Sequence, residues 1–79
     1  MQVFVAVLST VIDADEFEKS WRLDGGDTLL PDAGFAFAGQ KISLRLEPGP
    51  EGRWQTEVVH QAISSAVRRV DRSCNIRWM

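Results

Sequence analysis

Residues 34–47, GFAFAGQKISLRLE, have the pattern of a β-hairpin. Their second half alternates apolar and polar side chains, with Ile42, Leu44 and Leu46 in the apolar positions. A period of two predicts a strand that buries one face and exposes the other to water. Between the halves lies Gly39-Gln40, and glycine first in a two-residue loop is typical of a type II′ turn. The middle of the chain is therefore predicted to form two antiparallel strands.

The residues before this hairpin indicate the beginning of a helix. Asp13 occupies an N-cap position and Glu16 follows three residues later, which is capping-box spacing with aspartate in place of serine or threonine. Ile12 and Phe17 stand at the two positions of a hydrophobic staple. One glycine of the pair at 25–26 is expected to adopt a positive φ and end the helix.

Loops and a second helix are predicted on either side of the hairpin. Residues 27–33 are expected to form a loop with a turn at Pro31-Asp32. The Pro-Gly-Pro sequence at 48–50 is expected to break the strand. Residues 53–70 carry a broad apolar stripe at helical spacing, so they predict the second helix.

The two ends of the chain predict the remaining strands. Residues 2–9 are apolar on both faces, which suits a central strand, and residues 74–79 predict a short last strand. The resulting order, βαββαβ, is that of the ferredoxin-like fold. We expect one α+β domain over residues 1–79, a two-layer sandwich with a four-stranded antiparallel sheet and two helices on one face. The expected strand order is 4-1-3-2.

One face of this sheet is expected to remain open. We expect the helices to cover Val3, Val5 and Val7, which leaves Phe4, Lys41, Ser43 and Arg45 on the open face. The last strand adds either Asn75 and Arg77 or Cys74, Ile76 and Trp78. A basic sheet with a central aromatic suggests RNA recognition, but the third strand lacks the stacking aromatics of RNA-recognition domains. An ordinary solvated face is the simpler interpretation.

Charge is divided unevenly along the chain. The net charge is −2, but the first 39 residues contain seven acidic and two basic side chains, and the last 40 contain four acidic and seven basic ones. The seven acidic residues are Asp13, Asp15, Glu16, Glu18, Asp24, Asp27 and Asp32. They either complement the helix dipole and keep the protein in solution, or form a negative strip that faces a basic partner. Such a strip can compete with nucleic acid for lysine and arginine.

The sequence lacks a set of residues suited to catalysis or metal binding. His60, the only histidine, falls on the polar side of the second predicted helix and is expected to face solvent. The Asp24-Gly-Gly-Asp27 sequence does not have the spacing of a calcium loop, and no glycine-rich phosphate loop is present. Cys74 is the only cysteine and is expected to behave as a small apolar residue. We therefore expect no enzymatic activity, no metal and no cofactor.

A lone cysteine suits a reducing compartment, and the longest apolar run is too short to span a membrane. No positively charged segment precedes that run, so a signal peptide is not expected. The sequence thus predicts a cytoplasmic protein without a membrane partner. Trp78, the penultimate residue, is expected either to be packed by a well-docked last strand or to contact another chain.

These observations predict a small non-enzymatic protein-binding module, an inhibitor or regulator. By analogy of size and charge alone, phage-coded blockers of bacterial defence complexes, of the anti-CRISPR kind, are examples of this class. The expected partner is another protein, and a protein complex that binds nucleic acid is one example. The candidate contact residues are Asp13, Asp15, Glu16, Glu18, Asp24, Asp27, Lys41, Arg45, Arg77 and Trp78. The alternatives are a nucleic-acid- or small-ligand-binding module that uses the open sheet face, a homodimer formed through the sheet, and a minimal enzyme whose site forms in a dimer.

Overall fold

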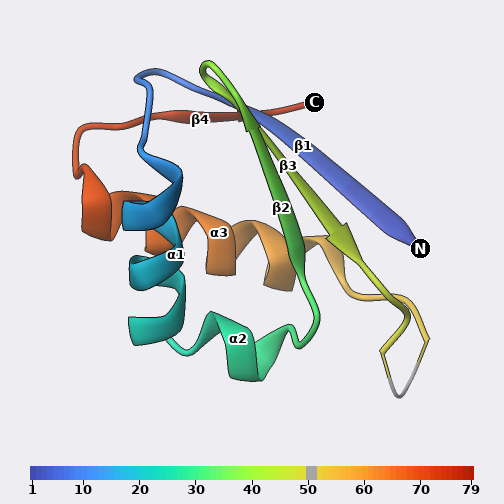
Figure 1. Ribbon diagram of the computed structural model, residues 1–79. Helices are drawn as coiled ribbons and strands as arrows, with labels where there is room; N and C mark the ends of the chain where they lie inside the picture. Colours follow the sequence, from blue (N-terminus) through green and yellow to red (C-terminus); the bar gives the residue numbers. More distant parts are fainter. Residues whose placement is uncertain (50–51) are drawn as a thin grey trace.

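Four strands form one antiparallel sheet in the order β2-β3-β1-β4 (Figure 1). The computed structural model describes residues 1–49 and 52–79, so Pro50, at the end of the predicted strand break, lies outside the described residues. The strands are β1 (Gln2–Leu8), β2 (Gly34–Ala38), β3 (Lys41–Leu46) and β4 (Ile76–Trp78). The α+β class with a four-stranded antiparallel sheet is confirmed.

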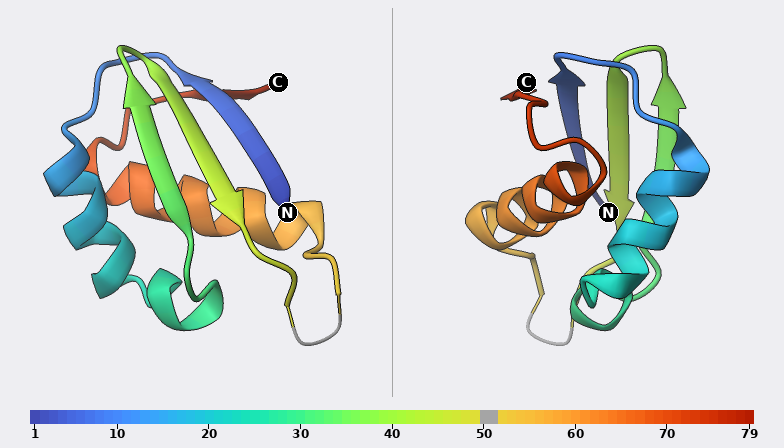
Figure 2. Two further views of the ribbon diagram at one scale, coloured as in Figure 1. Left: turned by 45° about the vertical axis from the view of Figure 1, so that its right-hand side comes forward. Right: turned by 90° about the vertical axis from the view of Figure 1, so that its left-hand side faces the viewer.

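Helices α1 (Ala14–Leu23) and α3 (Thr56–Val70) lie on the same side of the sheet, and no helix of the described residues covers the opposite face (Figure 2). α3 begins three residues later than predicted, with Gln55 as its N-cap. The hairpin is confirmed, because β2 and β3 pair through Gly39-Gln40 and Gly39 has a φ of 60°. A positive φ at this position is what the predicted turn requires.

The beginning of α1 follows the sequence prediction closely. Asp13 is the N-cap, and its carboxylate accepts a hydrogen bond of 3.2 Å from the backbone N–H of Glu16. Ile12 and Phe17 are both buried, as a hydrophobic staple requires. Gly25 follows the last turn with a φ of 80°, so it is the glycine that ends α1.

The segment predicted as a loop contains a third helix, the single turn α2 (Gly26–Leu29), so the expectation of two helices was wrong. The N–H of Leu29 bonds to the carbonyl of Gly25, and that of Leu30 to the carbonyl of Gly26. Leu30 is fully buried, which anchors this turn to the core. One turn is too short to show helical periodicity in a sequence. The predicted turn at Pro31-Asp32 is present.

The faces of β1 are the reverse of the prediction. Phe4 pairs with Leu44 and Ala6 pairs with Ile42. Directly opposed residues of neighbouring strands point to the same face, so Phe4 and Ala6 face the helices together with the apolar side of β3. Val3, expected under the helices, is 56% exposed. The sequence could not decide this, because β1 is apolar on both faces and only its register with β3 selects the buried one.

The last strand is shorter than predicted, and its register resolves the open alternative. Arg77 pairs with Val7 and shares the open face, while Ile76 and Trp78 lie on the helix side. Cys74 precedes the strand instead of lying in it, and it is 2% exposed, which agrees with its expected behaviour as a small apolar residue.

A single core lies between the sheet and the helix layer. Its buried hydrophobic residues are Ala6, Leu8, Ile12, Phe17, Trp21, Leu30, Ile42, Leu44, Leu46, Val59, Ile63, Ala66, Val67 and Cys74. Ser20 is the one buried polar residue among those described, and its hydroxyl donates a hydrogen bond of 2.6 Å to the carbonyl of Ala66. This bond joins α1 to α3. None of the helices described within residues 1–49 and 52–79 has both the length and the apolar content needed to cross a bilayer.

Candidate functional site

The open face of the sheet is built from rows of side chains that run across the strands. One row consists of Arg77, Val7, Lys41 and Ala38, so that a cation lies on each side of Val7. The next row has Val5, Ser43 and Ala36, and the third has Val3, Arg45 and Gly34. The strands described thus present valines and small residues with three cations and no acidic side chain on this face.

The open face also lacks aromatic side chains among the described strands. Phe35 and Phe37 alternate with the small residues of β2 and point toward α1, and Phe4 points toward α3. The sequence-based expectation of Phe4 at the centre of this face was therefore wrong. A face without aromatics lacks the ring surfaces on which the bases of single-stranded nucleic acid usually stack.

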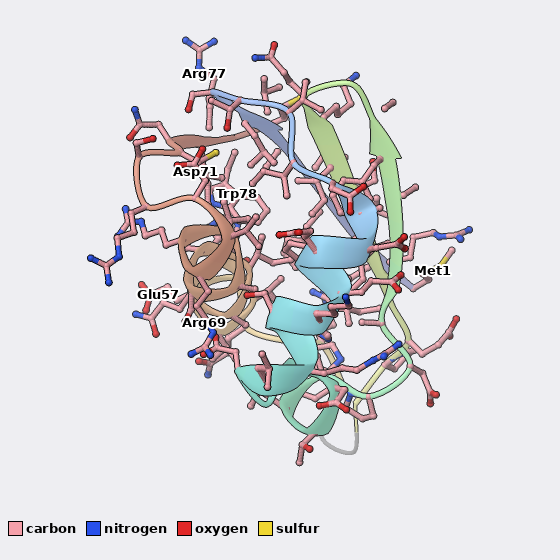
Figure 3. All side chains as sticks on the ribbon, turned by 60° about the vertical axis from the view of Figure 1, so that its left-hand side comes forward. Met1, Glu57, Arg69, Asp71, Arg77 and Trp78 are labelled. Atoms are coloured by element: carbon pink, nitrogen blue, oxygen red, sulfur yellow. The ribbon has the colours of Figure 1, made fainter. Side chains whose placement is uncertain are left out.

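Arg77 and Trp78 lie on opposite faces of the short last strand. Figure 3 shows Arg77 directed away from the helices and Trp78 directed between β4 and α3. The indole ring of Trp78 stacks on the imidazole of His60, with 3.7 Å between ring centroids and an interplanar angle of 10°. The ring centroids of Phe4 and the same imidazole lie 6.0 Å apart, with the two rings nearly perpendicular. Trp78 is therefore packed by its own chain, apart from Lys41, Arg45 and Arg77.

His60 is only partly exposed, whereas the sequence suggested a side chain that faces solvent. It is half-buried against Phe4 and Trp78, and this burial lowers the pKa of its imidazole below the ordinary value. The helical pattern placed His60 on the polar side of α3 but did not show that the last strand passes beside it. The aromatic partners on β1 and β4 make it a packing residue.

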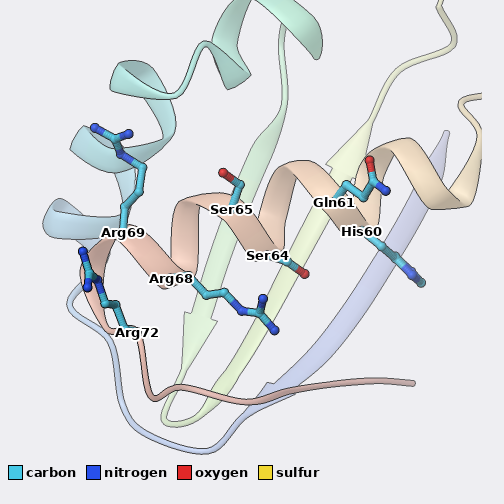
Figure 4. A pocket seen from close by; sticks show the side chains of 7 residues that line it. All are labelled: His60, Gln61, Ser64, Ser65, Arg68, Arg69 and Arg72. Carbon is cyan, nitrogen blue, oxygen red and sulfur yellow. The ribbon is translucent and has the colours of Figure 1, made fainter.

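The exposed side of α3 forms a shallow polar groove that contains three arginines (Figure 4). Its lining residues are His60, Gln61, Ser64, Ser65, Arg68, Arg69 and Arg72. Arg68 and Arg69 also lie in the last turn of α3, where the helix dipole favours cations. Arg69 lies 3.8 Å from the carboxylate of Asp24, which joins α3 to the end of α1. An exposed ion pair of this kind contributes at most about 1 kcal/mol.

The predicted acidic residues differ in their contacts with the rest of the chain. Asp13 caps α1, and Asp24 faces Arg69, so both have partners within the chain. Asp15 and Glu16 are exposed in the first turn of α1. The remaining acids are Glu18, which follows Asp15 by three residues on α1, and Asp27 and Asp32.

Those remaining acids, Glu18, Asp27 and Asp32, line a cleft of about 200 Å³ next to the first residues of β2. The other lining residues are Trp21, Arg22, Leu30, Ala33 and Phe35. The rings of Trp21 and Phe35 pack edge to face, with 5.0 Å between their centroids. The sequence identified Asp27 and Glu18 as contact candidates, but it could not show that they surround an aromatic wall.

A polar cluster connects the segment after β1 to the loop between α3 and β4. Asp71 accepts hydrogen bonds from the N–H and the hydroxyl of Ser73, at 3.0 and 2.7 Å, and one of 3.3 Å from Thr10. The bonds from Ser73 and Thr10 lower the pKa of this carboxyl. Each of these bonds closes a turn or joins two segments. Within residues 1–49 and 52–79, no group of three or more His, Cys, Asp or Glu side chains is arranged to hold a metal ion.

No protein-family model matches this chain, and no curated protein shows significant similarity to it. Three surfaces are therefore the candidate binding sites: the open sheet face, the α3 groove and the cleft beside β2.

Proposed function

We propose that this protein is a non-enzymatic binding module of the ferredoxin-like class, and that its partner is another protein, bound through the open sheet face. The observation that carries this proposal is the composition of that face. Valines occupy its centre, Val3 is 56% exposed, and Lys41, Arg45 and Arg77 stand around them. An exposed apolar patch with a polar rim is typical of a protein interaction site.

The chemistry of the face favours a protein over a nucleic acid. Three cations can attract phosphates, but single-stranded nucleic acid also needs aromatic surfaces for its bases, and the described strands place all their aromatic rings on the helix side. Aliphatic side chains between cations suit a protein surface that has an apolar centre and carboxylates near its edge. The nucleic-acid-binding module remains the alternative function.

The inhibitory or regulatory role, with phage-coded blockers of bacterial defence complexes as its example, remains a prediction from size and charge. The exposed carboxylates of Asp15 and Glu16 on α1 are the second candidate surface for the same role. They lie on the helix layer, whereas the open face is on the opposite side of the sheet. Substitutions can therefore test the two surfaces separately.

Comparison of matched charge reversals tests this proposal. The variant K41E/R45E alters the open face, and R68E/R72E makes the same change of charge in the groove of α3. A third variant, D15K/E16K, alters α1 and retains the cap at Asp13. Each variant, immobilised beside the wild type, is used to capture proteins and RNA from a lysate of the source cells. Circular dichroism establishes that each variant is folded.

We expect one protein to be retained by the wild type and by R68E/R72E, and lost with K41E/R45E. The same purified protein should then bind the wild type directly and bind K41E/R45E at least about tenfold more weakly. Retention of nuclease-sensitive, salt-sensitive RNA in place of a protein would establish the alternative. Identical protein retention by all variants would disprove the role of the open face, and loss with D15K/E16K alone would assign binding to α1.

A further inference from the structure

β2 is the outer strand of the sheet on the side away from β4 (Figure 2). Its edge carries none of the features that usually prevent strands from pairing with other chains. The sequence Gly34–Ala38 contains no lysine and no proline, and its pairing with β3 is continuous over five residues without a bulge. The other edge, β4, has only three residues and carries Arg77.

The hydrogen-bond pattern of the sheet shows which groups of β2 are unpaired. The N–H of Leu8 bonds to the carbonyl of Gln40, so the even-numbered residues of β3 are directed toward β1. The odd-numbered residues of β3 are then directed toward β2, where they pair with Gly34, Ala36 and Ala38. The N–H and C=O groups of Phe35 and Phe37 consequently point outward, and no main-chain partner for them is present in the described residues.

The cleft described above lies on the helix side of this same edge, and Phe35 belongs to both. Glu18, Asp27 and Asp32 stand around it, and Arg22 is the one cation in its lining. Trp21 and Phe35 supply an aromatic wall. A cationic side chain that packs against aromatic rings and meets carboxylates is stabilised by both contacts.

We propose that β2 binds an extended segment of a partner protein as an added strand, and that a lysine or arginine of this segment enters the cleft beside Phe35. The main-chain groups of Phe35 and Phe37 bond to the segment. The residue paired with Phe35 points to the helix side, where the cleft opens, because directly paired residues share a face. This mode is β-strand addition, in which main-chain bonds give affinity and side-chain pockets give specificity.

Charge decides between a basic segment and a second copy of this chain. Two copies paired through β2 would bring two clefts together, each containing Glu18, Asp27 and Asp32. Like charges at such short range oppose association. This second site shares the protein-binding role proposed above but uses different residues from Lys41 and Arg45, so the two proposals can fail separately.

The test uses the whole protein and the peptide acetyl-Thr-Val-Thr-Arg-Thr-Val-Thr-amide, which places valines and arginine on one face of a strand. Amide signals of Phe35 and Phe37 are followed by NMR during titration. One control peptide has glutamate in place of arginine. Two others are methylated on a backbone nitrogen, either at arginine, whose N–H faces β2 in the proposed pairing, or at the next threonine, whose N–H points away.

We expect saturable shifts at Phe35 and Phe37, and affinity about tenfold weaker for the glutamate peptide. Methylation at arginine should abolish binding, whereas methylation at threonine should preserve it. The variant D27N/D32N should weaken the arginine peptide several-fold, because both carboxylates are lost. Asparagine tolerates the positive φ of 61° at position 32, so this variant is expected to fold. K41E/R45E should bind the peptide as the wild type does.

The proposal is overturned if these amide signals do not move at millimolar peptide, or if the arginine and glutamate peptides bind equally. It is also overturned if the Phe35 and Phe37 signals shift with protein concentration alone, because a second copy would then occupy the edge. If K41E/R45E captures no partner but still binds the peptide, the result supports binding of the partner through the open face and leaves the β2 site intact.

Discussion

The imidazole of His60 lies flat on the indole of Trp78, with ring centroids 3.7 Å apart. This contact joins the first third of α3 to the last strand, where Trp78 pairs with Ala6 of β1. It explains why a large aromatic residue next to the end of the chain is held in place. We therefore expect the last strand to be less stable when the imidazole is protonated.

The pKa of His60 is expected to lie below the ordinary value of 6.5, because burial disfavours the charged imidazole. The folded state then binds fewer protons than the unfolded state between the lowered pKa and 6.5. The free energy of unfolding should therefore fall as the pH decreases through this window, and be fully restored above it. NMR titration of the imidazole measures its pKa, and denaturant unfolding at several pH values measures the free energy of unfolding.

The variants H60Q and W78L separate the causes of this pH dependence. In H60Q, the free energy of unfolding should no longer change with pH across this window. In W78L, the pKa of His60 should return toward 6.5 because the imidazole becomes hydrated. An unchanged pKa in W78L would show that the indole is not what shields the imidazole.

The variant G26A is expected to destabilise the protein by about 1–3 kcal/mol, the usual cost of overpacking. A Cβ atom at Gly26 would collide with the ring of Trp21, which is itself buried. G34A is the matched control, since its Cβ would lie 3.8 Å from the Arg45 guanidinium, an ordinary contact. Unfolding in urea compares the two. Equal stability of both variants would contradict the packing of α2 against Trp21.

Local signals in the sequence predicted the parts of the fold that depend on local chemistry. The cap at Asp13 and the turn at Gly39 each require a particular residue at a particular place, so both could be read from the sequence. The orientation of β1 depends on contacts between distant segments, and the single turn α2 is too short to show a helical pattern in the sequence. Val3 and Phe4 are both apolar, and the pairing of Phe4 with Leu44 alone shows which one is buried.

The same distinction applies to the candidate sites. Lys41 and Arg45 were expected on the open face because β3 alternates clearly, whereas the last strand left Arg77 undecided until its register was known. The cleft beside β2 could not be predicted, since Glu18 and Asp32 come from segments that meet only in the folded chain.

The contribution of the hydrogen bond between Ser20 and Ala66 to stability can be measured separately from the effect of helix propensity. S20A removes the 2.6 Å bond from the hydroxyl to the Ala66 carbonyl and should cost about 1 kcal/mol. S65A is its control, because Ser65 is an exposed residue of α3 and gains the same helix propensity. S20A should therefore be less stable than S65A by about 1 kcal/mol in urea unfolding. Equal midpoints would mean that the bond contributes nothing to joining α1 and α3.

Removal of the α1 cap is the last test, and it separates the capping oxygen from the charge. D13A deletes the acceptor of the 3.2 Å bond from the Glu16 N–H and should destabilise the protein by about 0.5–2 kcal/mol. D13N keeps an oxygen at the same place and removes only the charge, so its cost should be smaller. Both variants should lower the urea midpoint without changing the slope of the transition, because the surface exposed on unfolding stays the same. If D13N were as unstable as D13A, attraction between the carboxylate and the helix dipole, and not the hydrogen bond, would account for the stabilisation.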